Sequence, residues 1–131
     1  MADEQGSGVA PSPVAGFLQK EFFVIFTEPA APMEEIRKLM PQHLKRQLEL
    51  EEKGILFAAG PLFDAIADPS KRPGTGMIVI RASSQEEAVK IAAEDPLHKA
   101  GLRTFEVKTW KVNEGSYSVT VKYSDQSMEV I

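Results

Sequence analysis

The order of apolar runs along the chain is the feature that most constrains its fold. Short runs rich in β-branched and aromatic residues are typical of strands, and they alternate here with stretches of helical periodicity. In chain order, we expect strands at 21–27, 55–61, 77–81 and 104–112, and helices at 33–53 and 85–94. This β-α-β-β-α-β order predicts an α+β protein with a ferredoxin-like sheet and both helices on one face of it.

Proline and glycine suggest where the first helical region is divided. Pro41 would cost about 3 kcal/mol inside a helix but is well tolerated at a first helical position. We therefore expect one or two helical turns at 33–40 and a new helix that begins at Pro41 and ends at the capping residue Gly54. In that helix Leu44 and Leu48 stand four residues apart, which predicts an amphipathic helix, and an adjacent row holds His43, Gln47 and Leu50.

The second helix and the segment after it carry their own start signals. Ser84 is expected to cap the helix at 85–94. Asp95 precedes Pro96, a pair typical of a helix opening, in which the carboxylate accepts from backbone N–H groups of the next turn. That short turn is expected to end at Gly101.

The two ends of the chain differ in composition from the part between them. Residues 1–18 combine glycine, proline, serine and other small residues, which predicts a flexible leader. Near the other end, apolar and polar residues alternate over 117–123, which predicts an additional half-buried strand. We therefore divide the chain into a leader at 1–18, a ferredoxin-like domain at 19–113 and a C-terminal strand extension at 114–131.

Charge and composition exclude several classes of protein. Lys+Arg 15 against Asp+Glu 19 gives a net charge of −4, and the chain has no cysteine. The segment 20–113 is neutral, since the excess acidic residues lie at the two ends, and it has no basic stripe suited to nucleic acid. No disulfide, zinc–thiolate site or nucleophilic thiol can form without cysteine. No apolar run approaches the ~18 residues that suggest a membrane span, so we expect a cytoplasmic protein whose partner is a small molecule.

A sheet with helices on one face only leaves its other face bare. In a chain of this size a partner sheet normally covers such a face, so a homodimer is expected. The additional strand near the C-terminus could pair across the two subunits.

Few residues of the chain are suited to acid–base chemistry. His43 is the third residue of the helix expected to start at Pro41, where the helix dipole favours a neutral ring able to accept a proton; the alternative is a packing role. Asp95 is expected to serve as a cap, since Asp95 and His98 are more easily interpreted as parts of one turn than as a catalytic pair. His98 lies three residues after Asp95, and a metal site formed by all three is a further alternative, although no other metal-ligand spacing supports it. We expect neither a metal nor a cofactor.

Several other residues are candidates for contact with a substrate. Gly60 and Pro61, at the end of the second strand, would shape a pocket wall. Arg72 or Arg81 would orient a negatively charged group, although a basic pair such as Lys71 and Arg72 is more often a solvated surface. His98 is included among the candidate substrate-binding residues.

Over roughly residues 21–112 the sequence resembles the YciI-like (YCII-related) family. Four segments carry the resemblance in the right order on the expected elements: Met40-Pro41-Gln42-His43-Leu44, Ala58-Ala59-Gly60-Pro61-Leu62, Ala93-Glu94-Asp95-Pro96-Leu97-His98-Lys99-Ala100-Gly101 and Thr104-Phe105-Glu106-Val107-Lys108-Thr109-Trp110. The resemblance implies a dimeric α/β-barrel fold, related to muconolactone isomerase and to dehydrochlorinases of chlorinated hydroxyquinols. It also implies that His43 and Asp95 form a catalytic pair. His98 departs from the family pattern and could compete for Asp95.

The sequence therefore leads to two principal functional hypotheses. The first is an enzyme of lyase or isomerase type, in which His43 and Asp95 perform acid–base chemistry on a small cyclic or anionic compound by isomerisation, elimination or dehydrochlorination. The second is a non-catalytic module for ligand binding or dimeric assembly, in which Asp95 only caps its turn. A haem- or oxygen-handling monooxygenase of the same architecture rests on fold analogy alone.

Overall fold

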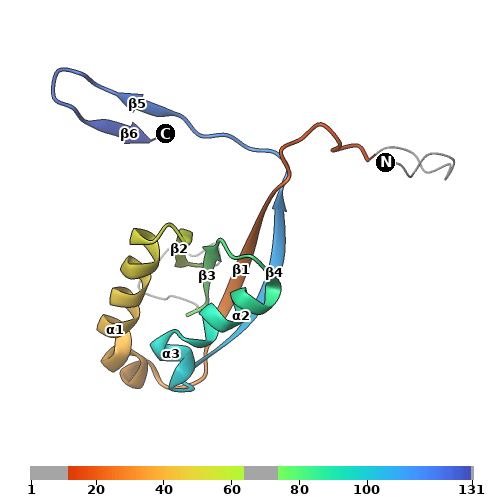
Figure 1. The fold of residues 1–131 in the computed structure, drawn as a ribbon. Coiled ribbons are helices and arrows are strands. Elements are labelled where there is room, and N and C mark those ends of the chain that lie inside the picture. Colours follow the sequence, from red (N-terminus) through yellow and green to blue (C-terminus); the bar gives the residue numbers. More distant parts are fainter. Residues whose placement is uncertain (1–11, 64–73, 131) are drawn as a thin grey trace, which may run out of the picture. The chain divides into compact units, whose positions relative to one another are not determined.

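The computed structural model describes residues 12–63 and 74–130 (Figure 1). By their internal contacts these residues divide into two compact units. One unit is Glu21–Lys111, and the other is formed by the two ends of the chain, up to Lys20 and from Val112 onwards. Each unit is described by itself below. The division into leader, domain and extension proposed from composition stays a prediction.

Four strands form the central sheet: β1 (Lys20–Pro29), β2 (Leu56–Pro61), β3 (Gly76–Ile80) and β4 (Arg103–Val112). Their order across the sheet is β2-β3-β1-β4, and β3 runs antiparallel to both of its neighbours. This is the ferredoxin-like arrangement that the order of apolar runs predicted, so the predicted fold class is confirmed.

The pairing of β1 with β3 shows which of their side chains lie on the same face of the sheet. Phe23 lies opposite Ile80 and Ile25 opposite Ile78, and these four side chains pack with Ala88 and Ala92 of the second helical region to form the core. Figure 1 shows the helices on this face. Since side chains alternate along a strand, Phe22, Val24 and Val79 point to the opposite face.

Helix α1 (Met33–Glu52) is continuous through Pro41, so the predicted restart of the helix at that residue is wrong. The buried residues Ile36, Gln47 and Leu50 lie on one side of the helix, on both sides of the proline in sequence. Packing of this shared face against the core offsets the missing hydrogen bond of Pro41, because tertiary contacts supply most of a helix's stability.

The buried face of α1 is the row next to Leu44 and Leu48. Leu44 and Leu48 are 53% and 63% exposed, whereas Leu50 is only 6% exposed. The row that contains His43, Gln47 and Leu50 therefore faces the protein, and the leucine pair faces solvent. The two rows are neighbours on the helix, and periodicity alone did not distinguish them.

The predicted caps of the later helices are confirmed. Helix α2 (Gln85–Ala93) begins after Ser84, whose hydroxyl oxygen accepts from the backbone N–H of Glu87. Helix α3 (Pro96–Lys99) begins after Asp95, which accepts from the backbone N–H of Leu97. Gly101 follows α3 with a φ of +74°, a left-handed conformation that glycine adopts without steric cost.

The C-terminal region contains two short strands instead of the single half-buried one expected. Strand β5 (Val119–Val121) pairs antiparallel with β6 (Met128–Val130), and the two form a separate two-stranded sheet. Both strands are exposed to solvent along their length. The alternation over 117–123 correctly indicated a strand, but it did not show that a second strand follows.

Within the part of the chain that the structure describes, no helix is both long and apolar enough to span a bilayer. The expected cytoplasmic location stays a prediction.

Leu48 and Leu50 of α1, of which only Leu50 is buried, give a matched test of the buried face of this helix. Leu50→Ala should lower the free energy of unfolding by about 2–5 kcal/mol, because it leaves a cavity in the core. Leu48→Ala makes the same chemical change on the solvent side and should shift it by no more than about 0.5 kcal/mol. Urea denaturation of both variants would measure this, and equal losses would contradict the assignment of the buried face.

Candidate active site

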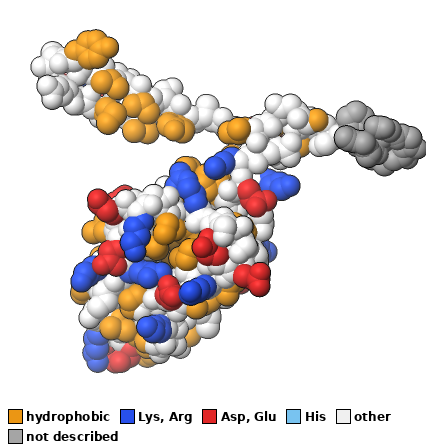
Figure 2. Space-filling view, in the orientation of Figure 1, with side chains coloured by type: hydrophobic (Ala, Val, Ile, Leu, Met, Phe, Trp, Pro, Cys, Tyr) orange, Lys and Arg blue, Asp and Glu red, His pale blue; other side chains and the backbone are white. Residues whose placement is uncertain are grey.

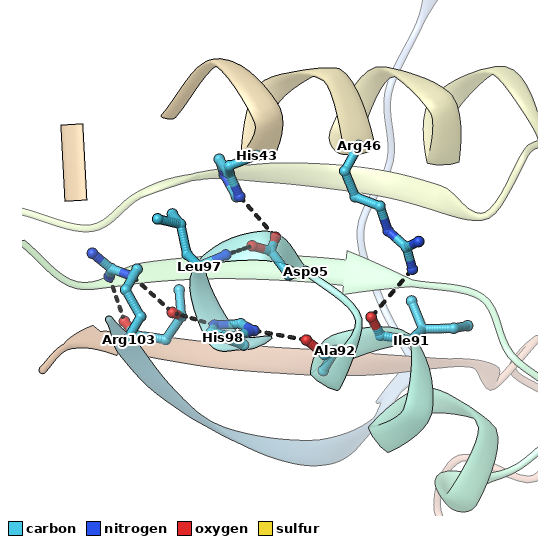
Figure 3. A network of polar contacts seen from close by, with 9 residues as sticks. His43, Arg46, Ile91, Ala92, Asp95, Leu97, His98 and Arg103 are labelled. Carbon is cyan, nitrogen blue, oxygen red and sulfur yellow. Dashed lines mark hydrogen bonds and ion pairs between the residues drawn. The ribbon is translucent and has the colours of Figure 1, made fainter. Parts of the chain in front are cut away.

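Asp95 occupies the junction between α2 and α3, and its two carboxylate oxygens have different partners. Oδ1 accepts from the backbone N–H of Leu97 at 2.9 Å, which is the capping bond of α3. Oδ2 lies 2.7 Å from Nδ1 of His43 (Figure 3). Capping and pairing with histidine were alternatives from the sequence, and the structure contains both contacts at once.

His43 projects from the inward-facing row of α1 towards α3, and it is partly accessible. Its side chain is 17% exposed and that of Asp95 is 6% exposed. Because α1 begins at Met33, His43 lies well inside the helix and not in its first turn. The helix-dipole argument for a neutral ring therefore does not apply.

The surroundings of Asp95 keep it ionised. Burial by itself would raise the pKa of this carboxyl, but the hydrogen bond and charge of His43 and the N–H of Leu97 hold the pKa below its usual value. An ionised carboxylate only accepts, so Nδ1 of His43 carries a proton and donates it to Oδ2. Among the described residues Nε2 of His43 has no hydrogen-bond partner, and in the neutral ring this nitrogen has a free lone pair.

His98 belongs to a different network. Its Nδ1 lies 2.8 Å from the backbone carbonyl oxygen of Ala92, and its Nε2 lies 2.8 Å from Oγ1 of Thr27. A carbonyl oxygen only accepts, so Nδ1 carries the proton. The neutral ring then accepts from the Thr27 hydroxyl at Nε2, and burial lowers the pKa of His98, which favours this neutral form. His98 therefore does not compete with His43 for Asp95.

Arg103 completes this second network, and sequence reasoning did not single it out. Its Nε donates to Oγ1 of Thr27 at 2.9 Å, and its guanidinium also donates to the backbone carbonyl oxygen of Thr27 (Figure 3). The guanidinium donates to the backbone carbonyl oxygen of Gly74 as well. The guanidinium thus connects the C-terminal end of β1 and the start of β4 with Gly74, which lies two residues before β3. A threonine at the end of a strand and an arginine at the start of another give no signal in sequence that they will meet.

The space immediately behind the catalytic candidates is small. A crevice of about 10 Å³, roughly one water, is lined by residues of α1, α2 and α3 together with the core strands, among them Arg46, Asp95 and His98. Arg46 donates to the carbonyl oxygen of Ile91 and forms an ion pair with Glu94, both at 3.3 Å. A ligand of more than a few atoms can therefore reach His43 only from its solvent-exposed edge.

A larger hollow of about 460 Å³ lies at one edge of the sheet, where β1 ends and where β3 and β4 begin. Its lining includes Thr27, Glu28 and Glu106 but neither His43 nor Asp95. The two glutamates disfavour an anion at this place.

The remaining candidate residues lie elsewhere. Gly60 and Pro61 pair with Met77 and Gly76 at the exposed end of β2, and they do not line the crevice at Asp95. Arg81 lies over the rings of Phe22 and Phe57, across the sheet from His43. Arg72 is outside the described residues. Roles for these four residues in substrate binding stay predictions.

The structure gives no support to the alternative of a metal site. Among the described residues, no group of three or more histidine, aspartate and glutamate side chains could hold a metal ion. His98, the proposed third ligand, has both ring nitrogens engaged by Ala92 and Thr27.

Comparison with known proteins adds to this geometry. The family model of the YCII-related domain matches residues 21–111, which include both His43 and Asp95. The chain belongs to the YCII-related family. This YCII-related protein is also similar to the solved 5-chloro-2-hydroxyhydroquinone dehydrochlorinase (TftG) from Burkholderia phenoliruptrix AC1100, in complex with 2,5-dihydroxybenzoquinone. The TM-score is 0.57 and the identity 25%, over 69% of this chain and 93% of that one. No curated protein matches the YCII-related chain.

The state of His98 gives a prediction that depends on pH. Since the pKa of His98 is lowered on folding, the unfolded chain binds more protons near pH 6.5, the usual pKa of histidine. His98 should therefore decrease the stability of the protein as the pH falls through 6.5 towards its lower folded-state pKa. The chain has two histidines, so a His43→Gln variant leaves His98 alone in the spectrum. Its ¹⁵N resonances should show the Nδ1–H form and a titration midpoint below 6.5, and a midpoint at or above 6.5 would contradict this network.

Proposed function

We propose that this protein is an enzyme in which His43, oriented by Asp95, acts as a general base on a small cyclic compound that carries hydroxyl or carbonyl groups. The reaction class is proton transfer that leads to elimination, including dehydrochlorination, or to isomerisation. A non-catalytic ligand-binding module is the competing hypothesis.

The observation that carries the proposal is the 2.7 Å contact between Nδ1 of His43 and Oδ2 of Asp95. An ionised aspartate that accepts from Nδ1 holds the ring in one tautomer and leaves Nε2 as the proton acceptor. The ring is held by a carboxylate that is itself fixed by the N–H of Leu97. A module without catalysis has no need for a histidine that is oriented in this way and still reachable from solvent.

In an elimination, Nε2 of His43 would take a proton from a ring carbon made acidic by a neighbouring carbonyl. The electron pair of the broken C–H bond becomes the new C=C bond, and the leaving group departs with its own bonding pair. In an isomerisation, the same proton would be returned to another atom of the substrate. The imidazolium that forms is stabilised by the ionised Asp95, whose pKa is already lowered by its hydrogen bonds.

The similarity to a dehydrochlorinase supports a hydroxylated or quinonoid ring as the substrate class. A compound of this kind is planar and carries several oxygens, and it can approach the exposed edge of His43 without entering the crevice behind Asp95. The predicted anionic substrate receives less support, because Arg81 lies across the sheet and Arg72 is outside the described residues.

We also propose that the protein is a homodimer. Of its two sheet faces, one is covered by the helices, and the other presents apolar and aromatic side chains. The exposed fractions of Phe57 and Trp110, 46% and 40%, show that part of this second face is open on the single chain. A second copy would bury it.

Variants of the two paired residues test the proposed chemistry. With 5-chloro-2-hydroxyhydroquinone as the assay substrate, His43→Gln should lower kcat by about 10²–10⁴-fold, because it removes the general base. Asp95→Asn keeps an oxygen that can cap α3 but loses the negative charge, so the fold should survive while kcat falls at least about tenfold. Chloride release measures turnover, and circular dichroism checks the fold.

His98→Gln is the matched control, because it alters the other histidine of the chain, whose ring nitrogens both serve the structure. Its kcat should stay within about threefold of the parent wherever it folds. If the parent binds 2,5-dihydroxybenzoquinone at His43, seen as shifts of its ring resonances, but turns over no compound of this class, the non-catalytic module is the correct hypothesis.

A further inference from the structure

The C-terminal arm, defined here as residues 113–130, has one wholly apolar face. Val119 pairs with Val130 and Val121 with Met128, so these four side chains lie together on one side of the hairpin. Thr120 and Glu129 form the pair between them and point to the other side. Figure 2 shows hydrophobic side chains gathered along this hairpin.

The turn of the hairpin is well defined. The backbone N–H of Lys122 donates to the carbonyl oxygen of Ser127, and Oδ1 of Asp125 accepts from both the N–H and the hydroxyl of Ser127. Gln126 adopts a φ of +59°, as tight turns require at one position. The arm is therefore built as a specific hairpin, with its apolar residues segregated to one face.

The apolar side chains of the arm are exposed. The exposed fractions are 47% to 94% for the apolar residues of the arm: Tyr117, Val119, Val121, Tyr123, Met128 and Val130. A hairpin of only two strands is at best marginally stable in water unless its apolar face packs against something. The hairpin therefore needs a covering surface.

The central domain has an uncovered surface of matching character, the aromatic patch. On the sheet face opposite the helices, the ring of Phe22 lies 4.5 Å from that of Phe57 and 6.1 Å from that of Trp110, measured between centroids. Phe57 and Trp110 remain 46% and 40% exposed. The guanidinium of Arg81 lies over both phenylalanine rings, 5.5 and 5.4 Å from their centroids.

Charge favours contact between these two surfaces. Residues 114–130 carry Glu114, Asp125 and Glu129 against Lys122, a net charge of 1 − 3 = −2. The aromatic patch carries Arg81, and Lys108 lies on the same face of β4 as Trp110, two residues away. Glu106 is two residues further along that face, so the two cations there exceed it by one charge. An acidic hairpin with an apolar face thus complements an aromatic surface that carries cations.

We propose that the arm of each copy packs on the aromatic patch of a second copy of this chain. A twofold axis that relates two copies covers both arms and both patches at once. Each arm brings four exposed apolar side chains on one face to such an interface: Val119, Val121, Met128 and Val130. This inference rests on the homodimer proposed above and is independent of the proposed catalysis.

Two pairs of lysine substitutions in the full chain test the arm. Val119→Lys with Val121→Lys adds two charges to the apolar face, and Ser118→Lys with Thr120→Lys adds the same two charges to neighbouring positions on the other face. In sedimentation equilibrium, the first pair should raise the dimer dissociation constant at least tenfold, and the second should change it less than threefold.

Crosslinking identifies which surface the arm contacts. The chain has no cysteine, so single substitutions give unique attachment points. Val119→Cys on the arm, mixed with affinity-tagged Ala58→Cys beside Phe57, should give a mixed crosslinked dimer with a short bismaleimide. Leu48→Cys, on the exposed side of α1, should not crosslink to the arm.

The outcomes separate this inference from the homodimer itself. Equal dimer affinity for the parent and both lysine pairs would leave the homodimer standing and overturn the role of the arm. A parent that is monomeric at all concentrations would overturn both. If the Val119→Cys/Ala58→Cys double variant crosslinks only within one chain, the arm covers its own domain, and the exchange between copies is wrong.

Discussion

The carboxylate of Asp95 is the group on which the site depends, because it holds two elements at once. One oxygen caps α3 by accepting from the N–H of Leu97, and the other accepts a hydrogen bond from Nδ1–H of His43 on α1. The capping bond from Leu97 holds the Asp95 carboxylate in place, and the carboxylate in turn orients the imidazole ring of His43. The aspartate that precedes the proline and caps α3 thereby also positions a histidine of a helix distant in sequence.

The two histidines of the chain differ in the hydrogen-bond partners of their ring nitrogens. His43 faces a carboxylate with one nitrogen and leaves the other free at a partly exposed edge. His98 is enclosed between the carbonyl of Ala92 and the hydroxyl of Thr27, which Arg103 holds in turn. Both rings carry their proton on Nδ1, but only His43 has an unengaged nitrogen among the described residues. This difference supports the proposal that His43, and not His98, is the base.

Much of the fold was predictable because it follows from local chemistry. Strand-like runs, the Ser84 and Asp95 caps and the order of elements together led to the correct sheet. The predicted restart of α1 at Pro41 was wrong, and the sequence did not distinguish the buried row of α1, for one reason. The cost of Pro41 and the spacing of Leu44 and Leu48 are local quantities, whereas the path and buried face of a helix depend on what packs against it. The second strand of the C-terminal hairpin is short, at three residues, and carries a weak signal.

The sequence by itself determined the fold class, the position of the cap at Asp95 and the absence of cysteine chemistry, since each depends on residue type and near neighbours. The resemblance to the YCII-related family, and not spacing, pointed to His43 with Asp95. Only the tertiary structure decided that these two residues touch, that His98 is bonded elsewhere and that Arg103 joins Thr27. Such contacts join positions 52 to 76 residues apart or depend on ring orientation, and the folded core brings them within hydrogen-bond distance.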